Sequence, residues 1–235
     1  MKTYELSSAQ LESLRQLSTC IVASSIERFC VRLPNTGFAD SIIRSIFEDR
    51  PPVLGYAATA RIRTSEPPME GRSYYEHTEW WNHILSIPAP RIVVIEDLDK
   101  PAGLGAFIGE VQTHILLKLG CVGMVTNGTV RDLDLVKPTG FEMFASGVGV
   151  SHAYAHVFDF GGAVSIGGME VRPGDLIHGD RHGVQTIPLE IGAEIPQVAQ
   201  AILKRRQRIA GLCHSADFSL EKLRTAIQET EDFAK

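Results

Sequence analysis

Residues 91–126 read RIVVIEDLDKPAGLGAFIGEVQTHILLKLGCVGMVT, in which two apolar runs flank a glycine-rich stretch and a helical pattern. The runs at 91–97 and 121–126 have the length and apolar content of buried strands. Between them, the sequence predicts a glycine-rich loop at 101–109 and a helix at 110–120. Strand, loop, helix and strand within about 36 residues are typical of a βαβ unit with parallel strands and a right-handed crossover.

The helix expected at 110–120 has apolar residues at helical spacing and a glycine at its end. Val111, Ile115 and Leu119 recur every four residues, so we expect them to share the buried face of the helix. Gly120 is a typical C-terminal cap, because glycine adopts left-handed backbone conformations without steric cost. The helix is therefore expected to begin directly after the glycine-rich loop and to end just before the second strand.

Upstream of this unit, the sequence predicts helices, one strand and one loop. Ser7 and Gln10 form a plausible capping box, and leucines at helical spacing predict helical structure over the first 30 residues. The other elements expected here are one or two helical turns at 41–50, a strand at 53–64, a surface loop at 65–75 and a helix at 77–87.

Downstream of the unit, the pattern changes to short β segments separated by glycines. The segments are FEMFASG, HAYAHVFDFG, AVSIGGMEV, DLIHGD and VQTIPL, and VRPGD (171–175) is a strong turn signal. From residue 193 onward the chain has helical character, with a break near 214–217. We therefore expect one α/β domain over residues 1–192 and a C-terminal helical tail, packed on it, over residues 193–235.

The composition is that of an ordinary globular chain and excludes several functional classes. Of the 235 residues, 44% are hydrophobic and 22% charged, and the net charge of -5 gives no basic excess of the kind that indicates nucleic-acid binding. Four cysteines without a CxxC pair argue against a structural zinc site and a disulfide scaffold. No signal segment and no run of about 20 apolar residues occurs, so we expect a cytoplasmic protein without membrane spans.

The strand at 121–126 is followed directly by NGTVRDLD (127–134), which places a cation beside an anion. A turn is favoured by asparagine and glycine, but it does not require Arg131 next to Asp132. Taken alone, the pair could be a solvated turn or an acid at a helix N-terminus. Glu110 could likewise be an ordinary first-turn acid that the helix dipole favours.

Two longer segments carry a family resemblance. GEVQTHILLKLGCVGMVTNGTVRD (109–132) and GGMEVRPGDLIHGDRHGVQTIP (167–188) resemble the family that contains the regulator of ribonuclease activity A and the metal-dependent 4-hydroxy-4-methyl-2-oxoglutarate aldolases. Some members of this family carry a misleading older label as menaquinone methyltransferases. The family signature is an acid, twenty residues and then Arg-Asp, which Glu110 and Arg131-Asp132 match. The resemblance extends from about residue 20 to about residue 190.

The resemblance implies a swivelling β/β/α-type fold, assembled as a homotrimer or as a homohexamer built from trimers, with sites near the subunit boundaries. It also implies Mg²⁺ or Mn²⁺ chemistry on pyruvate-derived 2-oxo acids. In that chemistry, Arg131 can hold the substrate carboxylate, because a guanidinium matches a carboxylate with two parallel hydrogen bonds. Asp132 offers the hard oxygen ligand that Mg²⁺ and Mn²⁺ prefer.

The start of the helix at 110–120 supplies the remaining expected contacts. Gly109 permits close backbone approach, and the free N–H groups of Val111 and Gln112 could meet the substrate carboxylate. Glu110 could position a water that takes a proton from the leaving hydroxyl and later protonates the enolate carbon. Asp97 is interpreted as a strand-end acid that could help to orient the site.

Several features are interpreted as structural, and two depart from the family pattern. The histidines lack a tight ligand spacing and are interpreted as packed or surface residues: His152, His156, His178 and His182. The segment GDRHGV carries Arg181 and His182 where relatives often have acids. The tail also has no obvious counterpart of a C-terminal glutamate that some aldolases use in a neighbouring subunit. These departures concern substrate identity more than metal binding.

Two functions follow from the sequence. The leading hypothesis is a divalent-metal-dependent lyase that cleaves a 4-hydroxy-2-oxo acid to pyruvate, with oxaloacetate decarboxylase side activity. The alternative is a non-catalytic, protein-binding regulator of a ribonuclease. The signature residues do not separate the two, because the regulator branch resembles the enzymes at these positions. The physiological substrate, the metal used in cells and the choice between trimer and hexamer stay open.

Overall fold

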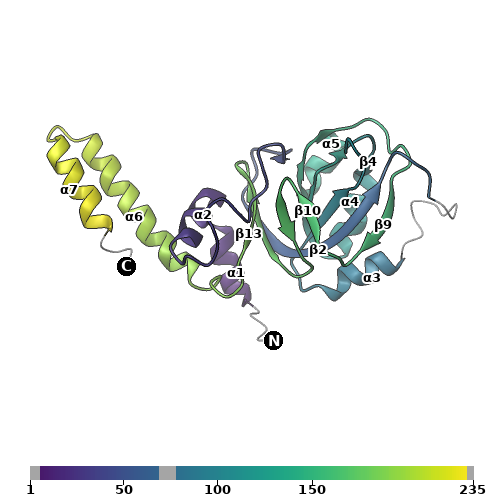
Figure 1. The fold of residues 1–235 in the computed structure, drawn as a ribbon, viewed down its shortest axis with the longest axis horizontal. Coiled ribbons are helices and arrows are strands. Elements are labelled where there is room, and N and C mark those ends of the chain that lie inside the picture. The colour runs from purple at the N-terminus through teal and green to yellow at the C-terminus, as the bar shows by residue number, and fades with distance from the viewer. Residues whose placement is uncertain (1–5, 69–77, 232–235) are drawn as a thin grey trace.

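The computed structural model describes residues 6–68 and 78–231, and a mixed eight-stranded sheet forms the centre of the body (Figure 1). The strand order is β1-β7-β5-β3-β2-β12-β13, and β9 pairs with a further part of β2. The strands are β1 (Arg44–Ser45), β2 (Val53–Arg63), β3 (Arg91–Asp97), β5 (Cys121–Thr126), β7 (Glu142–Ala145), β9 (His156–Phe160), β12 (Leu176–Asp180) and β13 (Gly183–Ile187). The expected α/β class is confirmed.

The four strands at the centre run parallel, so their carboxyl ends share one edge of the sheet. β2 pairs with β3, β3 with β5 and β5 with β7, all in parallel register. The βαβ unit predicted from the sequence is present as β3, α4 (Glu110–Lys118) and β5. Ligands of parallel sheets commonly bind beyond the carboxyl ends of the strands, which makes this edge the first place to look for a site.

The glycine-rich segment at 101–109 is not entirely a loop, which corrects the sequence prediction. Its last part forms β4 (Ala106–Ile108), which pairs in parallel with β6 (Thr129–Val130), and β6 pairs in parallel with β8 (Gly147–Val148). Strands this short depend on their partners for stability. Those partners lie in segments that are not neighbours in the sequence, so local pattern could not reveal them.

The buried face of α4 also differs from the prediction. Its buried residues are Gln112, Thr113 and Leu116, whereas Val111 is 52% exposed. The apolar spacing selected the wrong face because two of the three buried side chains are polar. Gly120 does follow the helix with a φ of 73°, as expected of a C-terminal cap residue.

The segment at 41–50 is a second correction, because it forms turns and the short strand β1 rather than helical turns. Arg44 and Ser45 pair with Ala145 and Phe144 of β7. The apolar residues that suggested a helix are the buried side chains on either side of this strand, Ile43 and Phe47. The loop expected at 65–75 lies partly outside the described residues.

The remaining elements surround the sheet. The predicted capping box is present, with Ser7 accepting a hydrogen bond from the N–H of Gln10. The other helices of the body and the small hairpin are α1 (Ser8–Arg15), α2 (Thr19–Glu27), α3 (Thr78–Ser86), α5 (Leu133–Val136), η1 (Lys137–Thr139), β10 (Val164–Ile166) and β11 (Met169–Val171). None of the helices within residues 6–68 and 78–231 is long and apolar enough to cross a membrane.

A buried polar cluster fastens α2 to β12. His178 is fully buried, with Nδ1 at 3.1 Å from Thr19 Oγ1 and Nε2 at 3.3 Å from the Leu14 carbonyl oxygen. The Thr19 N–H donates to Asp180 Oδ2 at 2.9 Å. Burial lowers the pKa of His178 to about 4, although the Asp180 charge opposes the shift. His178 is therefore a packed residue, as expected from the sequence.

The burial of His178 predicts how the free energy of unfolding depends on pH. Its folded pKa of about 4 lies below the ordinary value of about 6.5, so between these values the unfolded chain binds more protons and stability falls as pH falls. We expect roughly 2 kcal/mol of unfolding free energy to be lost between about pH 7 and about pH 5. Urea unfolding at both values measures the loss. His178→Gln should flatten this dependence, and an unchanged slope in that variant would refute the assignment.

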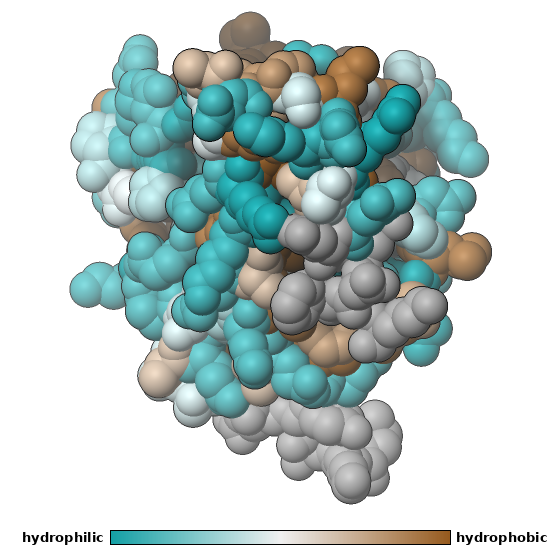
Figure 2. Space-filling view, turned by 90° about the vertical axis from the view of Figure 1, so that its left-hand side faces the viewer, coloured by the Kyte–Doolittle hydropathy of each residue, from teal (hydrophilic) through white to brown (hydrophobic). Residues whose placement is uncertain are grey.

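Two helices form an arm that projects from one end of the body (Figure 1). α6 (Ile195–Cys213) and α7 (Leu220–Glu231) are separated by a break at 214–219, as predicted. α6 buries Ile195, Ala199 and Ile202, of which the last two pack with Ile21 of α2. Figure 2 shows that mainly hydrophilic side chains cover the face of the molecule on this side. A division into domains at residue 192 remains an interpretation.

Candidate functional site

Two polar residues link the carboxyl ends of β3 and β5. The Asp97 N–H donates to Asn127 Oδ1 at 2.7 Å, and Asn127 Nδ2 donates to the Asp97 carbonyl at 3.0 Å. Asp97 Oδ2 accepts a hydrogen bond from the Gly103 N–H at 2.7 Å. Burial raises the pKa of Asp97, although the hydrogen bonds that its carboxylate accepts from the N–H groups of Gly103 and Asp99 oppose the shift. Asp97 thus fixes the loop that leads to α4, and Asn127 joins two strands as well as starting a turn.

The sequence-predicted pair lies just beyond this link, at the end of β6. The Arg131 N–H donates to the Ile108 carbonyl at 3.1 Å, which continues the pairing of β6 with β4. Arg131 Nε donates to Asp132 Oδ1 at 3.1 Å, and the Glu110 N–H donates to Asp132 Oδ2 at 3.2 Å. The fold therefore brings Glu110, Arg131 and Asp132 together, although twenty residues separate Glu110 from Arg131 in the sequence.

Gly109 makes this close approach possible. A Cβ atom at this position would lie 2.4 Å from Asp132 Oδ2 and 3.0 Å from Arg131 Cγ, which is too close for any side chain. Asp132 has φ 58° and ψ 37°, a left-handed conformation that aspartate tolerates better than most residues. Both backbone features serve to place the Asp132 carboxylate against the N-terminus of α4.

The surroundings of Asp132 favour its ionised form. Partial burial acts against ionisation, but the hydrogen bond from the Glu110 N–H and the hydrogen bond and charge of Arg131 outweigh it, with a further contribution from His152. The net result is a pKa for Asp132 below the ordinary value. About a quarter of the Asp132 and Arg131 side chains is exposed, at 27% each. The site therefore presents an anion and a cation that remain accessible from solvent.

The groups beside Asp132 retain donors for a ligand. Arg131 uses Nε for Asp132, and among the described residues its Nη groups have no acceptor. The N–H groups of Val111 and Gln112 precede the first internal hydrogen bond of α4, which runs from Thr113 to Gly109. Asp132 already takes the first N–H of the helix, so these two amides are the remaining donors of its N-terminal turn.

The residues present fit a hexacoordinate divalent metal ion with few protein ligands. Among residues 6–68 and 78–231, no group of three or more histidine, cysteine or acidic side chains could enclose an ion. Mg²⁺ commonly keeps several waters and binds through one or two carboxylates plus substrate oxygens. The ionised and partly exposed carboxylate of Asp132 is such a ligand, and it has lone pairs beyond the two that accept hydrogen bonds.

The structure adds His152 as a neighbour of the site, although the sequence predicts a packed or surface residue at this position. His152 Nδ1 lies 3.0 Å from the Ala106 carbonyl oxygen, and the His152 ring is close enough to influence the Asp132 charge. The residue follows β8, whose parallel pairing with β6 brings this stretch to the site. A Cβ atom on Gly105 would lie 2.3 Å from the His152 carbonyl oxygen, so the glycine-rich segment permits this approach as well.

Other polar residues near this edge are structural. Asp99 accepts hydrogen bonds from the N–H groups of Thr64 and Ser65 at 2.7 and 2.8 Å, which closes the turn after β2. At the opposite edge, where β2 begins, Asp180 accepts from both the N–H and Nδ1 of His182 at 2.8 and 3.0 Å. These contacts satisfy the side chains within the fold and leave the group around Asp132 as the candidate site.

Comparison with known proteins gives the same family as the sequence motifs. A model of the RraA-like family, described as Aldolase/RraA, matches residues 28–185. A Halalkalibacterium halodurans protein, named provisionally as a 4-hydroxy-4-methyl-2-oxoglutarate aldolase, is 28% identical over 137 residues, or 58% of this chain and 60% of that protein. The matched stretch of another curated relative covers 21% of its length. The chain thus spans less than two thirds of these relatives.

Solved structures share the fold at low sequence identity. An uncharacterised protein from Pseudomonas syringae has a TM-score of 0.73 at 21% identity, covering 96% of this chain and 97% of that one. Streptomyces coelicolor RraAS2, described as an unusual member of the RNase ES inhibitor RraA family, has a TM-score of 0.68 at 19% identity, covering 86% and 96%. The fold expected from the resemblance is confirmed, and the chain belongs to the RraA-like family.

Proposed function

We propose that this protein is a divalent-metal-dependent lyase that cleaves a 4-hydroxy-2-oxo acid to pyruvate, with oxaloacetate decarboxylation as a side activity. The observation that carries the proposal is the meeting of the Asp132 carboxylate with the Arg131 guanidinium and the N-terminus of α4. Membership of the RraA-like family and the relative named as an aldolase support the same chemistry.

Each group of the site has one task in this proposal. Asp132 holds Mg²⁺ or Mn²⁺ through the carboxylate lone pairs that its two hydrogen bonds leave open. The bound ion supplies Lewis-acid polarisation of the substrate keto oxygen, worth several kcal/mol. Arg131 binds the substrate carboxylate through its Nη groups, while its bond to Asp132 fixes their direction. The N–H groups of Val111 and Gln112 complete the binding of that carboxylate.

The reaction requires one proton to be removed and one to be delivered. The bond between C3 and C4 breaks as the 4-hydroxyl group loses its proton, and the bonding electrons move into the 2-oxo group as an enolate. Protonation at C3 then yields pyruvate and a carbonyl product. Glu110, half-buried at the start of α4, positions the water that accepts the first proton and returns one to C3. With oxaloacetate, carbon dioxide leaves instead of the carbonyl product.

Metal removal tests this function directly. We expect the protein to consume oxaloacetate and 4-hydroxy-4-methyl-2-oxoglutarate in the presence of Mg²⁺ or Mn²⁺. Turnover should stop after EDTA treatment and recover when the metal ion is restored. Pyruvate release coupled to lactate dehydrogenase measures the rate, with the uncatalysed metal reaction subtracted. Full turnover in EDTA would contradict the proposal, because the enolate would then form without the polarising ion.

The alternative function is a protein-binding regulator of a ribonuclease. RraAS2 has a similar fold at 19% identity, and a likeness at this level shows the fold alone and gives no evidence for the regulatory function. Absence of turnover with every 2-oxo acid tested, together with tight and specific binding of a ribonuclease, would replace the lyase proposal with the regulator.

Exposed apolar side chains surround the site and support assembly into a homotrimer or a homohexamer. Val148, the last residue of β8, is 57% exposed, and Val150, just after β8, is 94% exposed. Further exposed apolar residues on the adjoining segments are Leu104, Val111, Leu135 and Tyr154. A rim of this kind around a functional site is typical of a surface that another protein copy covers.

The rim makes a prediction for the assembly. We expect sedimentation equilibrium to give three or six chain masses, and Val150→Glu to lower that mass because a buried charge at a subunit contact is costly. Leu85→Glu, on the exposed side of α3 away from the rim, is the matched control and should leave the mass unchanged. A wild-type protein with the mass of one chain would remove the assembly from the proposal.

A further inference from the structure

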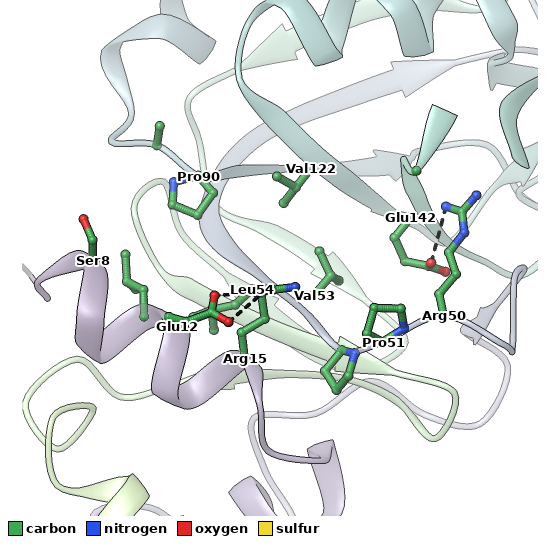
Figure 3. A pocket seen from close by; sticks show the side chains of 14 residues that line it. Ser8, Glu12, Arg15, Arg50, Pro51, Val53, Leu54, Pro90, Val122 and Glu142 are labelled. Atoms are coloured by element: carbon green, nitrogen blue, oxygen red, sulfur yellow. Dashed lines mark hydrogen bonds and ion pairs between the residues drawn. The ribbon is translucent and has the colours of Figure 1, made fainter. Parts of the chain in front are cut away.

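A cavity lies at the edge of the sheet opposite the Asp132 site (Figure 3). Its volume is about 460 Å³, within the range of small-molecule sites. It opens where the parallel strands begin, so its lining includes the first residues of β2 and β7 and the residue before β3. One wall is α1 and the opposite wall is the segment 50–52. Nothing in the proposed lyase chemistry uses this cavity.

The floor and part of the wall of the cavity are apolar. Val53, Leu54 and Val122 provide branched side chains, and three prolines add flat ring surfaces. In Figure 3 the side chains of Val53, Val122 and Pro90 point into the space between α1 and the sheet. The three prolines are Pro51, Pro52 and Pro90. Such a surface fits the apolar, ring-sized body of a small molecule.

Glu142 contributes a buried carboxylate to the lining, and one of its oxygens accepts no hydrogen bond among the described residues. Its side chain is 5% exposed, and Ser45 Oγ donates to Oε1 at 3.0 Å. Oε2 is buried and accepts no hydrogen bond among the described residues; the nearest cation is Arg50 Nη1 at 3.6 Å. A buried acceptor without a donor is unfavourable, and most such atoms in folded proteins have a partner. A donor from a bound molecule would remove this deficit.

The charges around the cavity balance. Glu12 and Arg15 of α1 form a two-point ion pair at 2.8 and 2.9 Å. Arg50 lies beside Glu142 and also donates to the Phe141 carbonyl, which fixes its guanidinium. With two cations and two anions paired in this way, an additional charge would be buried without a partner. The lining therefore favours an uncharged molecule.

From these observations we infer a second ligand site that takes an uncharged molecule with an apolar ring-sized body and one primary amide group. The amide N–H donates to Glu142 Oε2, the ring lies on the prolines and valines of the floor, and the amide oxygen faces the Arg50 guanidinium. This site is independent of the proposed lyase function, because it shares no residue with the Asp132 site and lies at the other edge of the sheet.

Binding of benzamide tests the site. Titration of isotope-labelled protein at about pH 8, followed by amide chemical shifts of Leu54, Val122 and Gly140, should show saturable binding. Glu142→Gln should weaken it about tenfold, as expected for loss of a hydrogen bond to a charged acceptor. N,N-dimethylbenzamide has the same ring and carbonyl but lacks the N–H donor, and it should bind about tenfold more weakly to the wild type.

Three further variants test the site even if Glu142→Gln proves unstable. Val122→Phe fills the floor and leaves Glu142 in place, so it should abolish the shifts, whereas Glu79→Gln, at an exposed acid of α3 outside the cavity lining, should leave them unchanged. Asp132→Asn should also leave benzamide binding unchanged, so failure of the lyase proposal cannot be mistaken for failure of this one. Absence of saturable binding, or equal affinity for benzamide and its dimethyl derivative, would overturn the inference and leave Glu142 as an anchor for Arg50 alone.

Discussion

Replacing Asp132 with asparagine should lower kcat/KM for oxaloacetate about a thousandfold at saturating Mg²⁺, which corresponds to about 4 kcal/mol of lost stabilisation. An amide is a weak ligand for a hard divalent ion, whereas the ionised carboxylate of Asp132 is a strong one. Asparagine also adopts the left-handed backbone conformation that position 132 requires, so the fold is retained. The steady-state rate of pyruvate formation measures the effect.

Asp134→Asn is the matched control for this substitution. Asp134 lies two residues further along, in the first turn of α5, and its side chain is exposed. It carries the same charge as Asp132, but among the described residues no hydrogen bond or ion pair joins its side chain to Arg131 or to α4. We expect its turnover to stay within about twofold of wild type. Similar turnover in the wild type and in the Asp132→Asn variant would contradict the role of the carboxylate.

Replacing Arg131 with alanine should lower kcat/KM by a similar factor, mainly through KM. Two charge-assisted hydrogen bonds to the substrate carboxylate, each worth about 2 kcal/mol, together correspond to roughly a thousandfold. Arg131→Lys retains the positive charge beside Asp132 but cannot offer two parallel N–H groups. It should therefore recover only part of the loss, which separates the paired geometry from the charge alone.

A control variant and a substrate analogue test whether Arg131 acts on the substrate carboxylate. Arg181→Ala removes an exposed arginine from the turn between β12 and β13 and should leave KM unchanged. A substrate whose carboxylate is replaced by an amide should react equally slowly with wild type and Arg131→Ala, because the Arg131 guanidinium then has no carboxylate to bind. If the two proteins still differed as much with this analogue, Arg131 would act through Asp132 and not through the substrate.

The sequence predicted the parts of the fold that local pattern determines. The apolar runs of β3 and β5 and the turn at Gly120 defined the βαβ unit, because each lies within one continuous stretch. The strands β4, β6 and β8 could not be predicted, since each has only two or three residues and exists through pairing with distant segments. The same cause explains the error at 41–50, where pairing with β7 overrides an apolar spacing that suggests a helix.

The candidate site was partly predictable for a geometric reason. The helix α4 and the strands β5 and β6 lie between Glu110 and Arg131, so the chain returns to the edge of the sheet from which α4 began. The left-handed conformation of Asp132 and its approach to Gly109 had no signal in the sequence. His152 could not be placed either, because its position depends on the parallel pairing of β8 with β6.

Binding of Mn²⁺ followed by electron paramagnetic resonance tests the central claim, that Asp132 holds the ion and Arg131 the 2-oxo acid, without depending on turnover. We predict that the free Mn²⁺ signal falls on titration with wild-type protein and falls further when pyruvate is added. Asp132→Asn should abolish the binding, and Arg131→Ala should keep it but remove the effect of pyruvate. Undiminished Mn²⁺ binding by Asp132→Asn would contradict the account.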